Sequence, residues 1–134
     1  MRNKAFIFAH IALFILFVWF GALKLCGYSP ANPMVAALLA QILPSATFHT
    51  FNLILGGYEA LIGLLFILPR REKLAIALLI PHLVMTTLPL VLLAGMTWKS
   101  FMVPTLEGQY IIKNVLIIAL AAMVFADSRR ERFE

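Results

Sequence analysis

Four long apolar segments follow one another along the chain, separated by short polar ones. They cover residues 5–25, 51–68, 74–94 and 109–126. Each is close to the ~20 residues that an α-helix needs to cross the hydrocarbon core of a bilayer. No segment alternates with the two-residue period of a transmembrane strand. The pattern therefore predicts an all-α fold, a polytopic membrane four-helix bundle that forms a single domain over residues 1–134.

The composition excludes several other classes of protein. Of the 134 residues, 63% are hydrophobic and only 13% are charged. A soluble domain of this size cannot bury that much apolar surface. The net charge of +5 comes from short basic clusters between the apolar segments. These clusters do not form the continuous basic face of a nucleic-acid-binding protein. A single cysteine, Cys26, allows neither an intrachain disulfide nor a CxxC redox pair. We also find no zinc or other metal-binding motif and no phosphate-binding loop.

The basic residues predict the orientation of the chain. With four spans, one side of the membrane carries eight of them: Arg2, Lys4, Arg70, Arg71, Lys73, Arg129, Arg130 and Arg132. The other side carries Lys24, Lys99 and Lys113. The positive-inside rule then places both termini in the cytoplasm. We expect the membrane to be a bacterial inner membrane. The first apolar segment is longer than the core of a signal peptide and no A-x-A site follows it, so we expect it to persist as a helix of the mature protein.

The first outer connection holds a shorter apolar segment, residues 34–43, which ends at Pro44. Asn32 and Pro33 before it are typical of an N-cap and a first helical residue. Ten residues cannot span a membrane. The pattern therefore predicts a short interfacial or reentrant helix in this connection.

Polar residues inside the apolar segments are the candidates for function, because they are costly in lipid. Glu59 lies within the second segment, and its carboxylate must be paired, protonated or in contact with water. It could handle protons or bind a substrate or quinone, or it could form a structural pair with a lysine. Lys24 ends the first segment, where it could also extend its ammonium group to the interface.

The third and fourth segments contribute further candidates. His82 lies between Pro81 and Pro89, which should kink its helix, and could relay protons, hydrogen-bond a carbonyl ligand or simply pack. Tyr110, Lys113 and Asn114 recur with Glu107 at helical spacing. Four polar groups on one face of a membrane helix should point into the bundle or into a wet cavity.

Three stretches of this sequence resemble the DoxX-like membrane proteins, the family related to DoxX and DoxD. They are FVWFGALKL at 17–25, YEALIGLLFIL at 58–68 and LEGQYIIKN at 106–114. The resemblance implies a four-helix membrane bundle, and the matching positions are Gly21, Lys24, Glu59, Tyr110, Lys113 and Asn114. Some relatives are small subunits of thiosulfate:quinone oxidoreductases and others belong to membrane complexes of redox stress. The resemblance therefore implies a membrane subunit with a bound quinone, no covalent cofactor and a redox partner protein.

These observations lead to one main hypothesis and two alternatives. The main hypothesis is a quinone-associated or redox-complex subunit, with a pocket in the outer half of the bundle lined by Lys24, Glu59, His82, Tyr110, Lys113 and Asn114. The first alternative is a small proton-coupled transporter that uses Glu59. The second is a non-catalytic membrane scaffold or assembly factor. The sequence leaves open whether the chain is part of an enzyme, which residue would be catalytic, and whether it forms a homo-oligomer.

Overall fold

Four helical spans form the molecule, as the apolar pattern predicts. The computed structural model describes residues 3–130 and residue 133, so Arg2 and Arg132 of the orientation argument lie outside the described residues. Two spans are single helices, α1 (Lys4–Leu25) and α3 (Phe48–Ile67). The other two are interrupted, and they consist of α4 (Glu72–Thr87) with α5 (Pro89–Leu92) and of α7 (Leu106–Ile112) with α8 (Asn114–Arg130). All four are long and apolar enough to cross a membrane, which confirms the all-α membrane fold.

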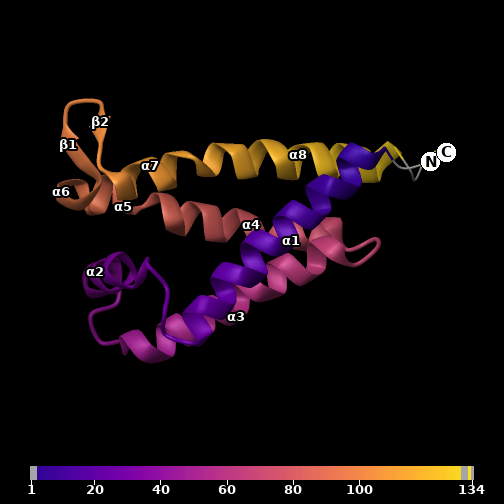
Figure 1. The fold of residues 1–134 in the computed structure, drawn as a ribbon. Helices are drawn as coiled ribbons and strands as arrows, with labels where there is room; N and C mark the ends of the chain where they lie inside the picture. The colour runs from indigo at the N-terminus through magenta and orange to yellow at the C-terminus, as the bar shows by residue number, and fades with distance from the viewer. Residues whose placement is uncertain (1–2, 131–132, 134) are drawn as a thin grey trace.

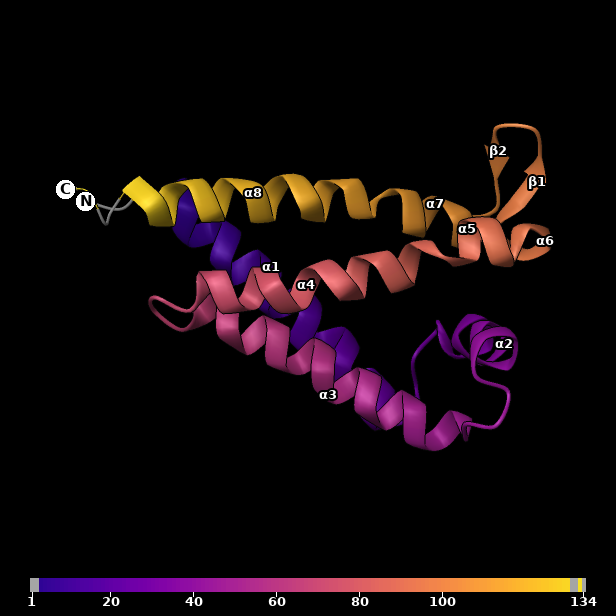
Figure 2. The same cartoon turned by 180° about the vertical axis from the view of Figure 1, so that it is seen from behind.

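The spans are arranged with both ends of the chain at one end of the bundle (Figure 1). The turn between α3 and α4, which carries Arg70 and Arg71, lies at the same end (Figures 1 and 2). The connections that hold α2 (Asn32–Ile42) and α6 (Ala94–Thr97) lie at the opposite end. This is the arrangement that an even number of membrane crossings requires.

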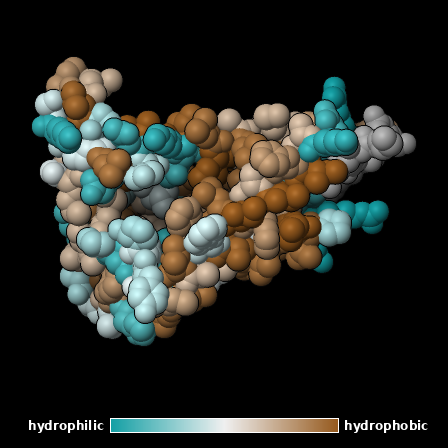
Figure 3. Space-filling view, in the orientation of Figure 1, coloured by the Kyte–Doolittle hydropathy of each residue, from teal (hydrophilic) through white to brown (hydrophobic). Residues whose placement is uncertain are grey.

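The apolar residues divide between a narrow core and the outer surface. Leu13, Ile62, Phe66, Leu79 and Val124 are buried in the core, at the level where the four spans meet. Many other large apolar side chains point outward, and the outer sides of the spans are strongly hydrophobic (Figure 3). A monomeric soluble protein rarely exposes an apolar surface of this extent, whereas lipid accommodates it.

Glycines allow α1 and α3 to cross in close contact. A Cβ atom at Gly21 would lie 2.6 Å from the backbone oxygen of Gly56, and one at Gly56 would lie 2.8 Å from the oxygen of Gly21. Further along, a Cβ at Gly63 would lie 2.8 Å from a methyl carbon of Val18. Such close approach of backbones is the usual role of small residues between membrane helices. It brings the side chains that flank the glycines into contact across the two helices.

The prolines of the third span act differently from each other. Pro89 begins α5 after α4 has ended at Thr87, so this proline interrupts the span as expected. Pro81 lies inside α4, and the helix continues through it. The Tyr58 hydroxyl of α3 donates a hydrogen bond to the carbonyl oxygen of Leu78, in the turn that the Pro81 ring loosens. This hydrogen bond connects α3 to the turn that precedes the proline, so a neighbouring helix supports the backbone there.

The connection after α1 contains the expected short helix, α2, but the predicted N-cap is wrong. Ala31 is the capping residue, with no side-chain hydrogen bond to the helix, and Asn32 is already helical. The Asn32 carboxamide instead donates to the carbonyl oxygen of Gly27 and accepts from Asn52 of α3. These longer-range partners compete with the local cap, so Asn32 connects α2 to the bundle.

The connection after α5 contains a small hairpin that the apolar pattern does not predict. Strands β1 (Trp98–Ser100) and β2 (Val103–Pro104) are antiparallel, with Trp98 opposite Pro104. Met102 in the turn has a φ of 59°, in the left-handed region. The Trp98 indole donates to the carbonyl oxygen of Leu90, which connects the hairpin to α5.

Candidate functional site

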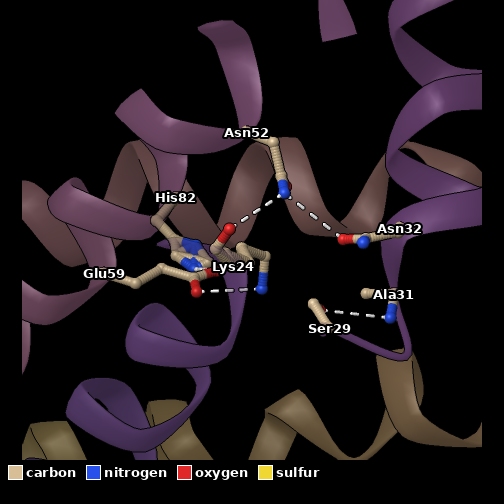
Figure 4. A network of polar contacts seen from close by, with 7 residues as sticks. All are labelled: Lys24, Ser29, Ala31, Asn32, Asn52, Glu59 and His82. Atoms are coloured by element: carbon tan, nitrogen blue, oxygen red, sulfur yellow. Dashed lines mark hydrogen bonds and ion pairs between the residues drawn. The ribbon is translucent and has the colours of Figure 1, made fainter. Parts of the chain in front are cut away.

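A cluster of three ionisable side chains lies between α1, α3 and α4. Lys24 Nζ is 2.9 Å from Glu59 Oε2, and His82 Nε2 is 3.0 Å from Glu59 Oε1. The three residues are only 7%, 5% and 7% exposed. We call them the Lys24–Glu59–His82 cluster (Figure 4).

The fold of α1 and α3 explains how the lysine reaches the carboxylate. Glu59 and Gly56 are three residues apart and lie on the same side of α3. Gly56 packs so closely against Lys24 that a Cβ there would clash, at 2.9 Å from the Lys24 Cβ. Lys24 is in the last turn of α1, and side chains of a helix lean toward its N-terminus, so its ammonium group points into the bundle.

The sequence predicted a pocket in the outer half of the bundle, and the structure places Glu59 and His82 at the inner border of that half. Glu59 lies 11 residues after the first residue of α3, which is about 16 Å along the helix axis. His82 lies 10 residues from either end of the third span, Glu72–Leu92. Both side chains are therefore near the middle of their spans.

Asn52 extends the polar contacts toward the connection with α2. Its amide nitrogen donates to the backbone oxygen of Lys24 at 3.2 Å and to Asn32 Oδ1 at 3.3 Å (Figure 4). Asn52 is one helical turn from Gly56, on the same side of α3 as Glu59. It was not among the predicted site residues. Its position seven residues before Glu59, within the same apolar segment, could have indicated it.

His82 connects the cluster to an aromatic environment. Its ring lies edge-on to Phe17 of α1, with ring centroids 5.6 Å apart, and edge-on to Tyr58, at 6.3 Å. The contact of Nε2 with Glu59 has the distance of an ion pair without the alignment of a full hydrogen bond. Among the described residues Nδ1 has no hydrogen-bond partner, although it is buried. An unpaired buried polar atom costs about 1–3 kcal/mol, so a ligand could gain affinity by pairing it.

A groove between α3 and α4 runs past His82. Its volume is about 240 Å³, and it is open on one side. Its lining is almost entirely apolar and consists of Phe51, Ile54, Leu55, Tyr58, Pro81, His82 and Met85. We call it the α3–α4 groove. Its lining has the composition of a small-molecule site, which combines apolar side chains with few polar groups, and its volume is smaller than the ~300 Å³ from which such sites usually begin.

The other predicted site residues lie elsewhere. Tyr110 is 63% exposed on α7, and the exposed Lys113 places its ammonium group 5.5 Å from the centre of the Tyr110 ring. Asn114 at the start of α8 donates to the Thr86 hydroxyl at 3.4 Å. The structure thus brings Lys24, Glu59 and His82 together, whereas Lys113 contacts Tyr110 and Asn114 contacts Thr86.

Of the two remaining histidines, one is buried and one is exposed. His10 Nδ1 lies 2.5 Å from the backbone oxygen of Phe66, near the end of the bundle that holds the termini. His49 is exposed at the start of α3. Within the described part of the chain, no group of three or more His, Cys, Asp or Glu residues could hold a metal ion.

No family model, curated protein or solved structure shows significant similarity to this chain. The functional argument therefore rests on the geometry of the cluster and the groove, together with the motifs in the sequence.

Proposed function

We propose that the chain is a DoxX-like integral membrane subunit that binds the ring of a quinone in the α3–α4 groove. One observation carries the proposal: His82, whose buried Nδ1 has no hydrogen-bond partner among the residues that the structure describes, lines an apolar groove between two membrane helices. Quinone rings are apolar and dissolve in the bilayer, and they carry oxygens at opposite edges. A single polar contact in an apolar groove suits such a ring.

The size of the groove supports the assignment. A closed apolar cavity of about 150 Å³ is enough to bind benzene. The groove has about 240 Å³ and is open on one side, so a substituted ring fits while its tail remains in lipid. Met85 and Phe51 border the groove, and an unbranched methionine can adapt to different substituents.

The cluster behind His82 supplies the polar chemistry. Glu59 fixes one edge of the imidazole ring, and Lys24 stabilises the carboxylate through a charge-assisted contact at 2.9 Å. A histidine held in this way can orient a ring oxygen and exchange a proton with it. The chain carries no redox cofactor motif, so electrons would pass to or from a partner redox protein. By the positive-inside rule, the termini of this subunit would lie in the cytoplasm of a bacterium.

Binding of a quinone to the purified protein tests the proposal. We expect the protein in lipid nanodiscs to bind duroquinone or its reduced form above the level of empty nanodiscs. His82→Phe should lower the affinity at least tenfold, because it removes the polar contact. His49→Phe is the matched control, since His49 is exposed and does not line the groove. No binding above the lipid background would contradict the proposal.

A scaffold function is the second candidate, and the short Lys24–Glu59 contact favours it. Both side chains are buried and paired directly, as in a purely structural ion pair. In that case Glu59→Gln would lower the thermal stability of the protein and leave the affinity for ring ligands unchanged. A loss of affinity at unchanged stability would argue against the scaffold.

A further inference from the structure

We infer that the α3–α4 groove selects the reduced, hydroxyl-bearing form of its ring ligand, because the cluster makes His82 Nδ1 a hydrogen-bond acceptor. The inference rests on the proposed function and adds the oxidation state of the ligand. It follows from which nitrogen of His82 carries the proton.

The contact with Glu59 decides the position of that proton. An ionised carboxylate has only acceptor sites, and a neutral imidazole has one donor and one acceptor nitrogen. Nε2 lies 3.0 Å from Glu59 Oε1. Two lone pairs at that distance would repel each other, so the proton belongs on Nε2.

Lys24 fixes the charge state on which this depends. Its ammonium group, 2.9 Å from Oε2, stabilises the carboxylate form of Glu59. With Lys24 positive, Glu59 negative and His82 neutral, the buried cluster has no net charge. A second proton on His82 would leave an uncompensated positive charge in the core of the bundle, which is costly.

Nδ1 is therefore the acceptor, and it lies on the opposite edge of the ring from the Glu59 contact. It is buried and has no hydrogen-bond partner in the described part of the chain, while His82 itself lines the groove. The other polar group in the lining is the Tyr58 hydroxyl, which already donates to the Leu78 carbonyl. Because His82 lines the groove, a ligand there that reaches Nδ1 meets an acceptor and must offer it a donor.

This requirement separates the two oxidation states of a quinone. The reduced ring, a hydroquinone, has hydroxyl groups that can donate to Nδ1. The oxidised ring has carbonyl oxygens, which are acceptors only and would face the Nδ1 lone pair. A site built to pair a hydroxyl rejects an analogue without it, because its own polar atom then stays unpaired.

Matched ligands test the inference. The affinities of duroquinol, duroquinone and the dimethyl ether of duroquinol would be compared anaerobically with the full chain in nanodiscs. We expect duroquinol to bind at least tenfold more tightly than the other two. The ¹⁵N NMR shifts of His82, assigned by comparison with His82→Gln, should show the proton on Nε2 in the ligand-free protein.

Glu59→Gln provides the decisive variant. The glutamine amide can donate to Nε2, which allows the proton to move to Nδ1, so the preference for the hydroquinone should disappear or reverse. Glu107→Gln is the matched control, because Glu107 is exposed on α7, and it should keep the preference. If Glu59→Gln does not fold, the ligand series and the ¹⁵N shifts of the unmodified protein remain sufficient.

The outcomes distinguish the two proposals. Equal affinities, tighter binding of duroquinone, or a proton on Nδ1 would overturn the selection of the reduced form and leave quinone binding intact. Binding of none of the three rings would overturn the proposed function and the inference with it.

Discussion

Two lysines in the membrane spans have opposite environments. Lys24 at the end of α1 is 7% exposed and contacts Glu59. Lys113 on the fourth span is exposed, and its ammonium group lies over the ring of Tyr110, three residues earlier in the same span. Both were candidates for the same pocket. The difference shows that a polar residue within an apolar segment becomes part of a site only where helix packing encloses it.

The packing of α1 against α3 provides this enclosure. Gly21 and Gly56 bring the two backbones together, and Lys24 and Glu59 lie beside that crossing. α7 has a different environment, because Gly108 packs it against the backbone of Thr97 rather than against α1 or α3. A Cβ at Gly108 would lie 2.1 Å from the Thr97 carbonyl oxygen. The polar face of α7 therefore stays on the surface.

Removal of each lysine charge should give the largest contrast between the two regions. Lys24→Met leaves a buried carboxylate without its cation, and we expect a loss of about 3–5 kcal/mol in the free energy of unfolding. Lys113→Met should leave stability unchanged. Unfolding in mixed micelles with increasing denaturing detergent would measure both. The double variant Lys24→Met/Glu59→Leu should recover part of the loss, and a double variant as unstable as Lys24→Met would contradict the pairing.

Enlargement of a glycine at the crossing should have the next largest effect. Gly56→Leu places a side chain against the Gly21 backbone and Lys24, and we expect a loss of about 1–3 kcal/mol or more from overpacking. Gly57→Leu is the matched control on the same helix, since a Cβ there meets nothing within 4 Å. The melting temperature in detergent would compare the two. Similar values for both variants would mean that α1 and α3 do not cross in close contact.

Removal of a tyrosine hydroxyl should have the smallest effect. Tyr58→Phe removes the hydrogen bond to Leu78 beside Pro81, and we expect a loss of about 1 kcal/mol. Tyr110→Phe should have no measurable effect, because the Tyr110 side chain is 63% exposed. Amide hydrogen exchange in α4 would report the local consequence. If Tyr58→Phe leaves the exchange protection of the turn before Pro81 unchanged, the hydroxyl does not support this turn.

The sequence by itself determined the number of spans and the short helix between the first two. These features depend on runs of apolar residues whose lengths match the membrane, and on prolines that end a helix, so each is local. The same reasoning singled out Lys24, Glu59 and His82, because charged and titratable groups are rare inside apolar segments.

Only the tertiary structure decided which of the polar residues meet. Lys24 and Glu59 are 35 residues apart along the chain, and their contact depends on two glycines that allow one helix to lie against another. Helical spacing placed Tyr110, Lys113 and Asn114 near one face but could not show what that face contacts. The predicted cap at Asn32 was wrong for the same reason. Local spacing favours a cap, but the fold brings Gly27 and Asn52 within hydrogen-bond distance, and the Asn32 side chain bonds to them instead.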